Sequence, residues 1–154
     1  MIQNNITKFI AMLVTGGALL AACKKDGDPL GDKISKIKQS WKITAISTPK
    51  AGQPNVDSSL LKACTTDDII QFTNTGFDFK DGATVCDSTV FGYAKGVWAY
   101  KLTGDSIQLQ TTAPTPAKYI AWKVVTLNDS VMQVRYTDST NPAKKILKTV
   151  SFKH

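Results

Sequence analysis

The fold is decided by the stretch VWAYKLTGDSIQLQTTAPTPAKYIAWKVVTLNDSVMQVRYT, residues 97–137. Apolar and aromatic side chains recur there at every second position, which is the period of a β-strand with one face buried. Short turn sequences such as Thr103-Gly104-Asp105 separate the runs and predict antiparallel hairpins. The runs occupy residues 97–102, 106–111, 119–127 and 130–137. No window in this stretch has a sustained period of 3.6 residues, so the sequence does not indicate helices here.

The same alternation continues on both sides of this stretch. Further runs occupy residues 41–45, 69–73, 76–80 and 145–152. Eight strands at spacings of about 8–12 residues predict an all-β, antiparallel up-and-down meander. Such a meander closes into an eight-stranded barrel because closure removes the exposed edge strands. A barrel of about eight strands is just wide enough to be filled by side chains or to hold one small ligand.

Two short helices are expected before the second strand. Apolar residues spaced by four and three positions predict an amphipathic helix over 30–38. A segment rich in proline and glycine, 49–54, is expected to end the first strand. Asp57 is a suitable N-cap for a second helical segment over 58–64. The barrel and its helices form one domain, 30–154.

The N-terminus has the pattern of a lipoprotein signal peptide over residues 1–22. Lys8 supplies a positive charge, an apolar run follows, and Leu20-Ala21-Ala22-Cys23 matches the bacterial lipobox. The lipobox implies that diacylglycerol is attached to Cys23, that the chain is cleaved before it, and that the new terminus receives a fatty acid such as palmitate. Two or three acyl chains give a lasting membrane anchor. A plain secretory signal or an uncleaved anchor is the alternative.

The lipobox therefore predicts a protein of the cell envelope that is anchored in the outer membrane and faces either the periplasm or the outside. Residues 23–29 then form a polar, lipidated tether. Cys64 and Cys86 remain as an even pair in an oxidising compartment, which favours a disulfide. The alternatives are two buried thiols or a metal pair, although no histidine or third cysteine accompanies them.

Several motifs follow one another in an order that points to a known family. They are the lipobox, Trp41 at the start of the first strand, CTTDDIIQF at 64–72, Cys86, Gly96-Val97-Trp98 and Gly104-Asp105. This order resembles the lipocalin-like lipoproteins of Bacteroidetes over essentially all of 23–154. The resemblance implies an eight-stranded barrel with a binding role and no established reaction. Lipocalins usually have Gly-x-Trp at the first strand, but Gln39 occupies the glycine position here, so the likeness is one of architecture.

Seven large side chains are expected to point into the barrel and to be candidates for ligand binding. They are Trp41, Phe72, Trp98, Tyr100, Trp122, Met132 and Tyr136. One interpretation is that they line an apolar cavity, because ligand pockets are mostly aromatic and aliphatic. The other is that three indoles and several further rings fill a small barrel completely, which their combined size favours.

Composition argues against an enzyme. All 12 acidic residues are aspartates, and the single histidine is His154, the last residue. Asp67-Asp68 is the only adjacent carboxylate pair, and neighbours on a strand point to opposite faces, so a capping or turn role is expected rather than acid–base chemistry. No motif for nucleotide, metal or covalent catalysis is present. The expectation is no reaction, no cofactor and no metal.

The net charge of +7 has two interpretations. It can attract anionic headgroups or glycans, or it can belong to lysines scattered over a solvated surface. The lysines lack the arginine and aromatic reading face typical of nucleic-acid binding, so no nucleic-acid partner is expected. The predicted function is therefore binding of a small apolar or amphipathic ligand. The alternative is a non-catalytic module with a solid core that binds protein or glycan.

Overall fold

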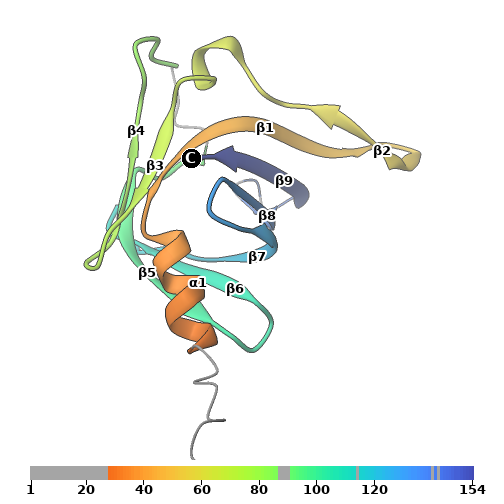
Figure 1. The fold of residues 1–154 in the computed structure, drawn as a ribbon. Coiled ribbons are helices and arrows are strands. Elements are labelled where there is room, and N and C mark those ends of the chain that lie inside the picture. Colours follow the sequence, from red (N-terminus) through yellow and green to blue (C-terminus); the bar gives the residue numbers. More distant parts are fainter. Residues whose placement is uncertain (1–27, 87–90, 114, 140, 142) are drawn as a thin grey trace, which may run out of the picture.

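The computed structural model describes residues 28–154 except 87–90, 114, 140 and 142. Eight antiparallel strands form a closed barrel, and a ninth lies outside it (Figure 1). The barrel closes because β9 pairs with both β8 and β1. The predicted fold class is confirmed. The signal peptide predicted over 1–22 and the lipidation site Cys23 lie outside the described residues.

The elements follow one another in simple order. They are α1 (Pro29–Ile37), β1 (Ser40–Lys50), β2 (Gln53–Ser59), the short 3-10 helix η1 (Ala63–Thr65), β3 (Ile69–Phe72), β4 (Phe77–Lys80), β5 (Lys95–Lys101), β6 (Ser106–Thr111), β7 (Tyr119–Leu127), β8 (Val131–Asp138) and β9 (Ile146–Lys153). Each barrel strand pairs with its neighbours in the sequence, apart from the β1–β9 closure and the β1–β3 pairing that passes over β2. Within the described residues, no helix is long and apolar enough to cross a membrane.

The prediction of a helix over 58–64 is wrong. Residues up to Ser59 belong to β2, which pairs with the far half of β1, and only the single turn η1 is helical. The first strand ends at Lys50, within the segment 49–54 as predicted, and Gly52 with a φ of +75° lets the chain reverse there into β2. Asp57 accepts a hydrogen bond from the Ser47 hydroxyl across this hairpin (2.9 Å) and caps no helix. The β1–β2 hairpin extends beyond the barrel (Figure 1).

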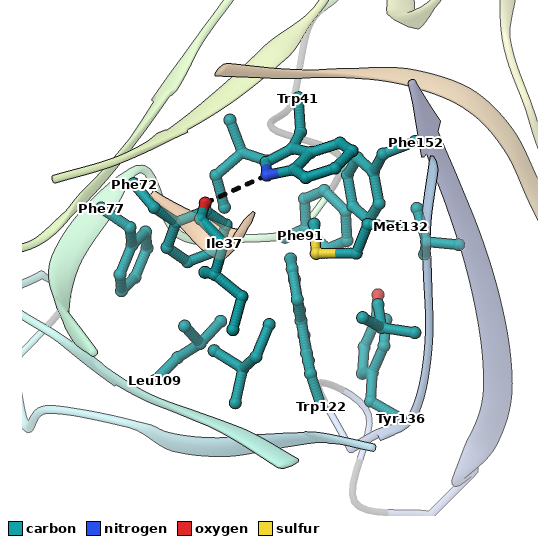
Figure 2. Close-up of a cluster of buried hydrophobic side chains, with 14 of the residues drawn as sticks. Ile37, Trp41, Phe72, Phe77, Phe91, Leu109, Trp122, Met132, Tyr136 and Phe152 are labelled. Atoms are coloured by element: carbon teal, nitrogen blue, oxygen red, sulfur yellow. Dashed lines mark hydrogen bonds between the residues drawn. The ribbon is translucent and has the colours of Figure 1, made fainter. Parts of the chain in front are cut away.

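Helix α1 covers one end of the barrel, and its prediction is confirmed. Asp28 caps its first turn, since its carboxylate accepts from the Leu30 N–H (3.0 Å). Ile37 at the other end is fully buried, and its carbonyl accepts a hydrogen bond from the Trp41 indole (3.0 Å; Figure 2). This contact fixes the helix to the start of β1. We call this end of the barrel the closed end.

Two further contacts fix α1 to hairpins at the closed end. The Lys33 ammonium lies 3.6 Å from the Asp105 carboxylate in the β5–β6 hairpin. Lys38 donates to the Asn74 side chain in the β3–β4 hairpin (2.9 Å). In an up-and-down barrel, alternate connections lie at opposite ends. The β4–β5, β6–β7 and β8–β9 loops therefore meet at the other end, which we call the mouth.

Candidate functional site

The barrel interior holds most of the residues predicted to line it. Trp41, Phe72, Trp122, Met132 and Tyr136 are buried in one cluster (Figure 2). Trp98 and Tyr100 are only half-buried and pack against this cluster. Their polar atoms bond to the Thr73 carbonyl and the Asp105 carboxylate, which places both side chains toward the closed end. That any of these residues binds a ligand stays a prediction.

Two interior residues were missed because they come from a loop. Phe91 and Tyr93 follow no strand period, yet both are buried in the core. Phe91 stacks on Phe79 of β4 with ring centroids 4.5 Å apart, and it lies 5.3 Å from the Trp122 ring. Gly92 between them has a φ of +68°, a backbone conformation that favours glycine. The sequence signal was the aromatic–glycine–aromatic triplet Phe91-Gly92-Tyr93.

The β4–β5 loop that carries these rings is fixed to the segment before β3. The disulfide between Cys64 and Cys86 is present, which confirms that prediction and indicates an extracytoplasmic, oxidising location. Asp68 accepts from the Gly82 N–H (3.0 Å), and Asp67 accepts from the Thr84 N–H (3.3 Å). The aspartate pair therefore stabilises the turn that follows β4, which agrees with the turn role predicted for it. Among the described residues, no group of three acidic, cysteine or histidine side chains could bind a metal.

Asp68 gives a pH-dependent prediction. Burial raises the pKa of its carboxyl, the Gly82 N–H opposes this, and Asp81 and Asp67 add to the rise. An acid with a raised folded pKa contributes stability that is present below its unfolded pKa of about 3.9 and is lost as pH rises through the folded value. Asp68→Asn keeps the acceptor without the charge, so we expect it to be more stable than the wild type at neutral pH.

This difference should disappear in acid, where Asp68 is protonated in both folded and unfolded chains. Urea unfolding at a series of pH values measures it. Asp78→Asn, which changes an exposed carboxylate on β4, is the matched control and should show no such gain. A variant Asp68→Asn that is less stable than the wild type at neutral pH would contradict the prediction.

A hollow of about 330 Å³ opens at the mouth. Its walls come from the β4–β5 loop, the start of β7 and the end of β8, and include Phe91, Tyr93, Ile120 and Tyr136. Its volume is at the lower end of the range of small-molecule pockets, about 300–1,000 Å³. The rim is polar, since Lys118 and Asp138 lie there and Asp138 forms a 2.6 Å ion pair with Lys148.

Two polar atoms beside this hollow are buried without a hydrogen-bond partner among the described residues. They are the hydroxyl of Tyr93, which lines the hollow, and the indole nitrogen of Trp122, which is fully buried behind the lining residues. Burial raises the pKa of Tyr93, and the nearby Trp122 indole N–H acts to lower it, although the two groups form no well-directed hydrogen bond. The effect of burial prevails for Tyr93, and burial likewise raises the pKa of Tyr136 above the ordinary value of a tyrosine. Both phenols therefore stay protonated and can donate hydrogen bonds, but neither can act as a base.

A larger hollow of about 550 Å³ lies over the β4–β5 pairing. It is shallower and more open than the mouth, and Thr73, Asp78, Lys95 and Thr112 are among its lining residues. None of the unpartnered buried atoms belongs to a residue in its lining. The mouth is therefore the better candidate site, in spite of its smaller volume.

Comparison with known proteins agrees with the architecture. The family model of the lipocalin-like domain matches residues 37–134, from the end of α1 to the middle of β8, which is more than half of the chain. No curated protein matches the chain. Together with the closed eight-stranded barrel and its aromatic interior, this match shows that the chain belongs to the lipocalin-like domain family.

Proposed function

We propose that this protein is an exported outer-membrane lipoprotein whose barrel binds a small apolar or amphipathic ligand at its mouth and catalyses no reaction. The observation that carries the proposal is the 330 Å³ hollow, whose wall combines aromatic rings with polar residues and includes Tyr93, which has a buried hydroxyl without a partner among the described residues. Apolar walls with a few placed polar groups are typical of sites that hold small molecules. Lipocalin-like domains are generally binding proteins, which supports the same function.

The membrane part of the proposal is supported by the lipobox that ends at Cys23 and by the disulfide. The proposed anchor lies only a few residues before Asp28, the N-cap of α1. Because α1 covers the closed end, an anchor at Cys23 would hold that end close to the membrane. The mouth would then face away from the lipid and stay accessible to ligand. A bacterium of the Bacteroidetes type is the proposed source, from the order of motifs alone.

Native mass spectrometry of the protein extracted from its own membrane tests both parts. We expect the mass of a chain that begins at Cys23, increased by diacylglycerol and one further acyl chain such as palmitate. We also expect a fraction that retains a small molecule, which is released when the protein is unfolded. A Cys23→Ser variant is the matched control and should carry no lipid. A mass without lipid would contradict the anchor, and a clean apo mass would weaken the binding proposal.

A second candidate function is a non-catalytic interaction module. It is favoured by the filled interior, in which Phe91 and Trp122 pack together where a larger ligand would otherwise lie. Exposed apolar side chains outside both hollows, such as Val125 at 47% exposure, could contact a partner. Co-purification of a stoichiometric protein partner, together with a clean apo mass, would support this function over ligand binding.

A further inference from the structure

We propose that the mouth selects an uncharged, flat, apolar molecule with a carbonyl-type oxygen that accepts hydrogen bonds from the Tyr93 hydroxyl and the Trp122 indole N–H. This inference rests on the proposed function for the presence of a ligand at the mouth. It adds the chemical class of that ligand, which neither the barrel architecture nor the family match supplies.

Two buried hydrogen-bond donors, the Tyr93 hydroxyl and the Trp122 indole N–H, lack an acceptor in the part of the chain that the structure describes. Tyr93 is 6% exposed and Trp122 is 0% exposed. Buried polar groups in folded proteins are almost always hydrogen-bonded. An indole N–H can only donate, and a phenol that stays protonated donates as well. The group that completes the pair must therefore be an acceptor.

Aromatic rings surround the two donors. The Phe91 ring lies 5.3 Å from Trp122 and 5.8 Å from Tyr93, and Trp122 lies 6.0 Å from Tyr136. Figure 2 shows Trp122 standing in the centre of the interior, with Phe91 and Tyr136 close by. Rings at these distances touch one another and leave no slot between them, so a planar molecule would stack on the side of this group that lines the hollow. The hollow of 330 Å³ has room for a small ring system.

The charges around the two donors favour a neutral oxygen in the ligand. The Asp138 carboxylate raises the pKa of both Tyr93 and Tyr136, so it disfavours negative charge at their hydroxyl groups. Lys148 pairs with Asp138 at 2.6 Å and is not directed at the hydroxyls by any contact described. An anionic oxygen would also lose its hydration in this apolar position. A cationic group has no lone pair to accept from the donors, so a neutral carbonyl fits best.

Three ring systems of nearly equal size test this class: fluorene, 9-fluorenone and fluorene-9-carboxylate. Isothermal titration of the whole protein measures the affinity of each. We expect fluorenone to bind about three- to tenfold more tightly than fluorene, as one or two neutral hydrogen bonds provide. We expect the carboxylate to bind more weakly than fluorenone. Tyr93→Phe should reduce the advantage of fluorenone over fluorene, because only the Trp122 indole N–H is left to donate, and should leave the affinity for fluorene unchanged.

Tyr100→Phe is the matched control, because Tyr100, although the sequence predicted it as a ligand-binding candidate, is not among the lining residues of the mouth. It removes the same hydroxyl group at the closed end, where the hydroxyl donates to Asp105. Its fluorenone affinity should equal that of the wild type, and its melting temperature should fall. Tyr93→Phe should melt at the same or a higher temperature, since its hydroxyl has no partner in the ligand-free protein.

The outcomes separate the inference from the function on which it rests. If none of the three probes binds, the inference is overturned, and the native mass measurement decides separately whether the mouth holds another ligand. If fluorene and fluorenone bind equally to the wild type and to Tyr93→Phe, the mouth binds apolar rings but water, not ligand, satisfies the donors, and the inference alone is overturned. Tightest binding of the carboxylate overturns the uncharged class. A lower melting temperature for Tyr93→Phe would show that the hydroxyl already has a partner and would also overturn the inference.

Discussion

Removal of the Cys64–Cys86 disulfide is expected to lower the free energy of unfolding by about 3 kcal/mol. The bridge closes a loop between cysteines separated by 22 positions, and opening it returns conformational freedom to the unfolded chain. Both cysteines are half-exposed, so a reductant can reach them without unfolding the barrel. Urea unfolding followed by tryptophan fluorescence, with and without reductant, measures the loss.

The folded state should change only locally on reduction. Asp67 and Asp68 still hold Thr84 and Gly82, so the β4–β5 loop keeps a second attachment. We expect faster amide hydrogen exchange in residues 91–94, while β6 to β9 stay protected. The double variant Cys64→Ser/Cys86→Ser is the control, because its stability should match the reduced wild type and not respond to reductant. An unchanged urea midpoint on reduction would contradict the prediction.

The barrel could be predicted because its strands have one face in the core and one in solvent. In β6 and β8, buried residues alternate strictly with less buried ones, as in the series Met132, Val134 and Tyr136. A period of two in the sequence is the direct consequence of this arrangement. The strand β2 gave no such signal because it lies outside the barrel and pairs only with the end of β1. Its polar residues, followed by two leucines, looked like a capped helix.

The candidate site was harder to predict because half of it comes from a loop. Phe91 and Tyr93 reach the interior through the fold of the β4–β5 connection, and no periodicity marks them. Trp98 was expected inside, but β4 pairs with β5 over only two residue pairs, so this ring is less covered than the others. Gly96 in the Gly-x-Trp motif has a local reason, since a side chain there would clash with the Gln110 carbonyl of β6. Sequence order alone does not show such contacts.

Phe91→Ala is expected to destabilise the barrel by about 3 kcal/mol and, at the same time, to improve ligand binding. The ring is only 7% exposed, and it contacts Phe79, Trp122 and Tyr136. Its removal costs the transfer of the ring to water and leaves a cavity that the surrounding rings cannot close. Urea unfolding at neutral pH measures the destabilisation.

The gain in binding follows from where this cavity opens. Phe91 lines the 330 Å³ hollow, so the space that it leaves joins the mouth. Apolar cavities of this kind stay dry and take up apolar molecules. A probe such as fluorene could bury roughly 60 Å² more apolar surface, which corresponds to about a tenfold higher affinity. Isothermal titration of fluorene into the wild type and the variant compares the two directly.

Phe72→Ala is the control that separates cavity from site. Phe72 is equally buried, but it lies next to the β3–β4 hairpin at the closed end and is not among the lining residues of the mouth. Its loss should cost a similar free energy of unfolding and leave the affinity for fluorene unchanged. Equal gains in both variants would mean that any loosening of the core admits the probe. No gain in Phe91→Ala would mean that the mouth is not where an apolar ligand enters, because the ring that closes it would then have no bearing on binding.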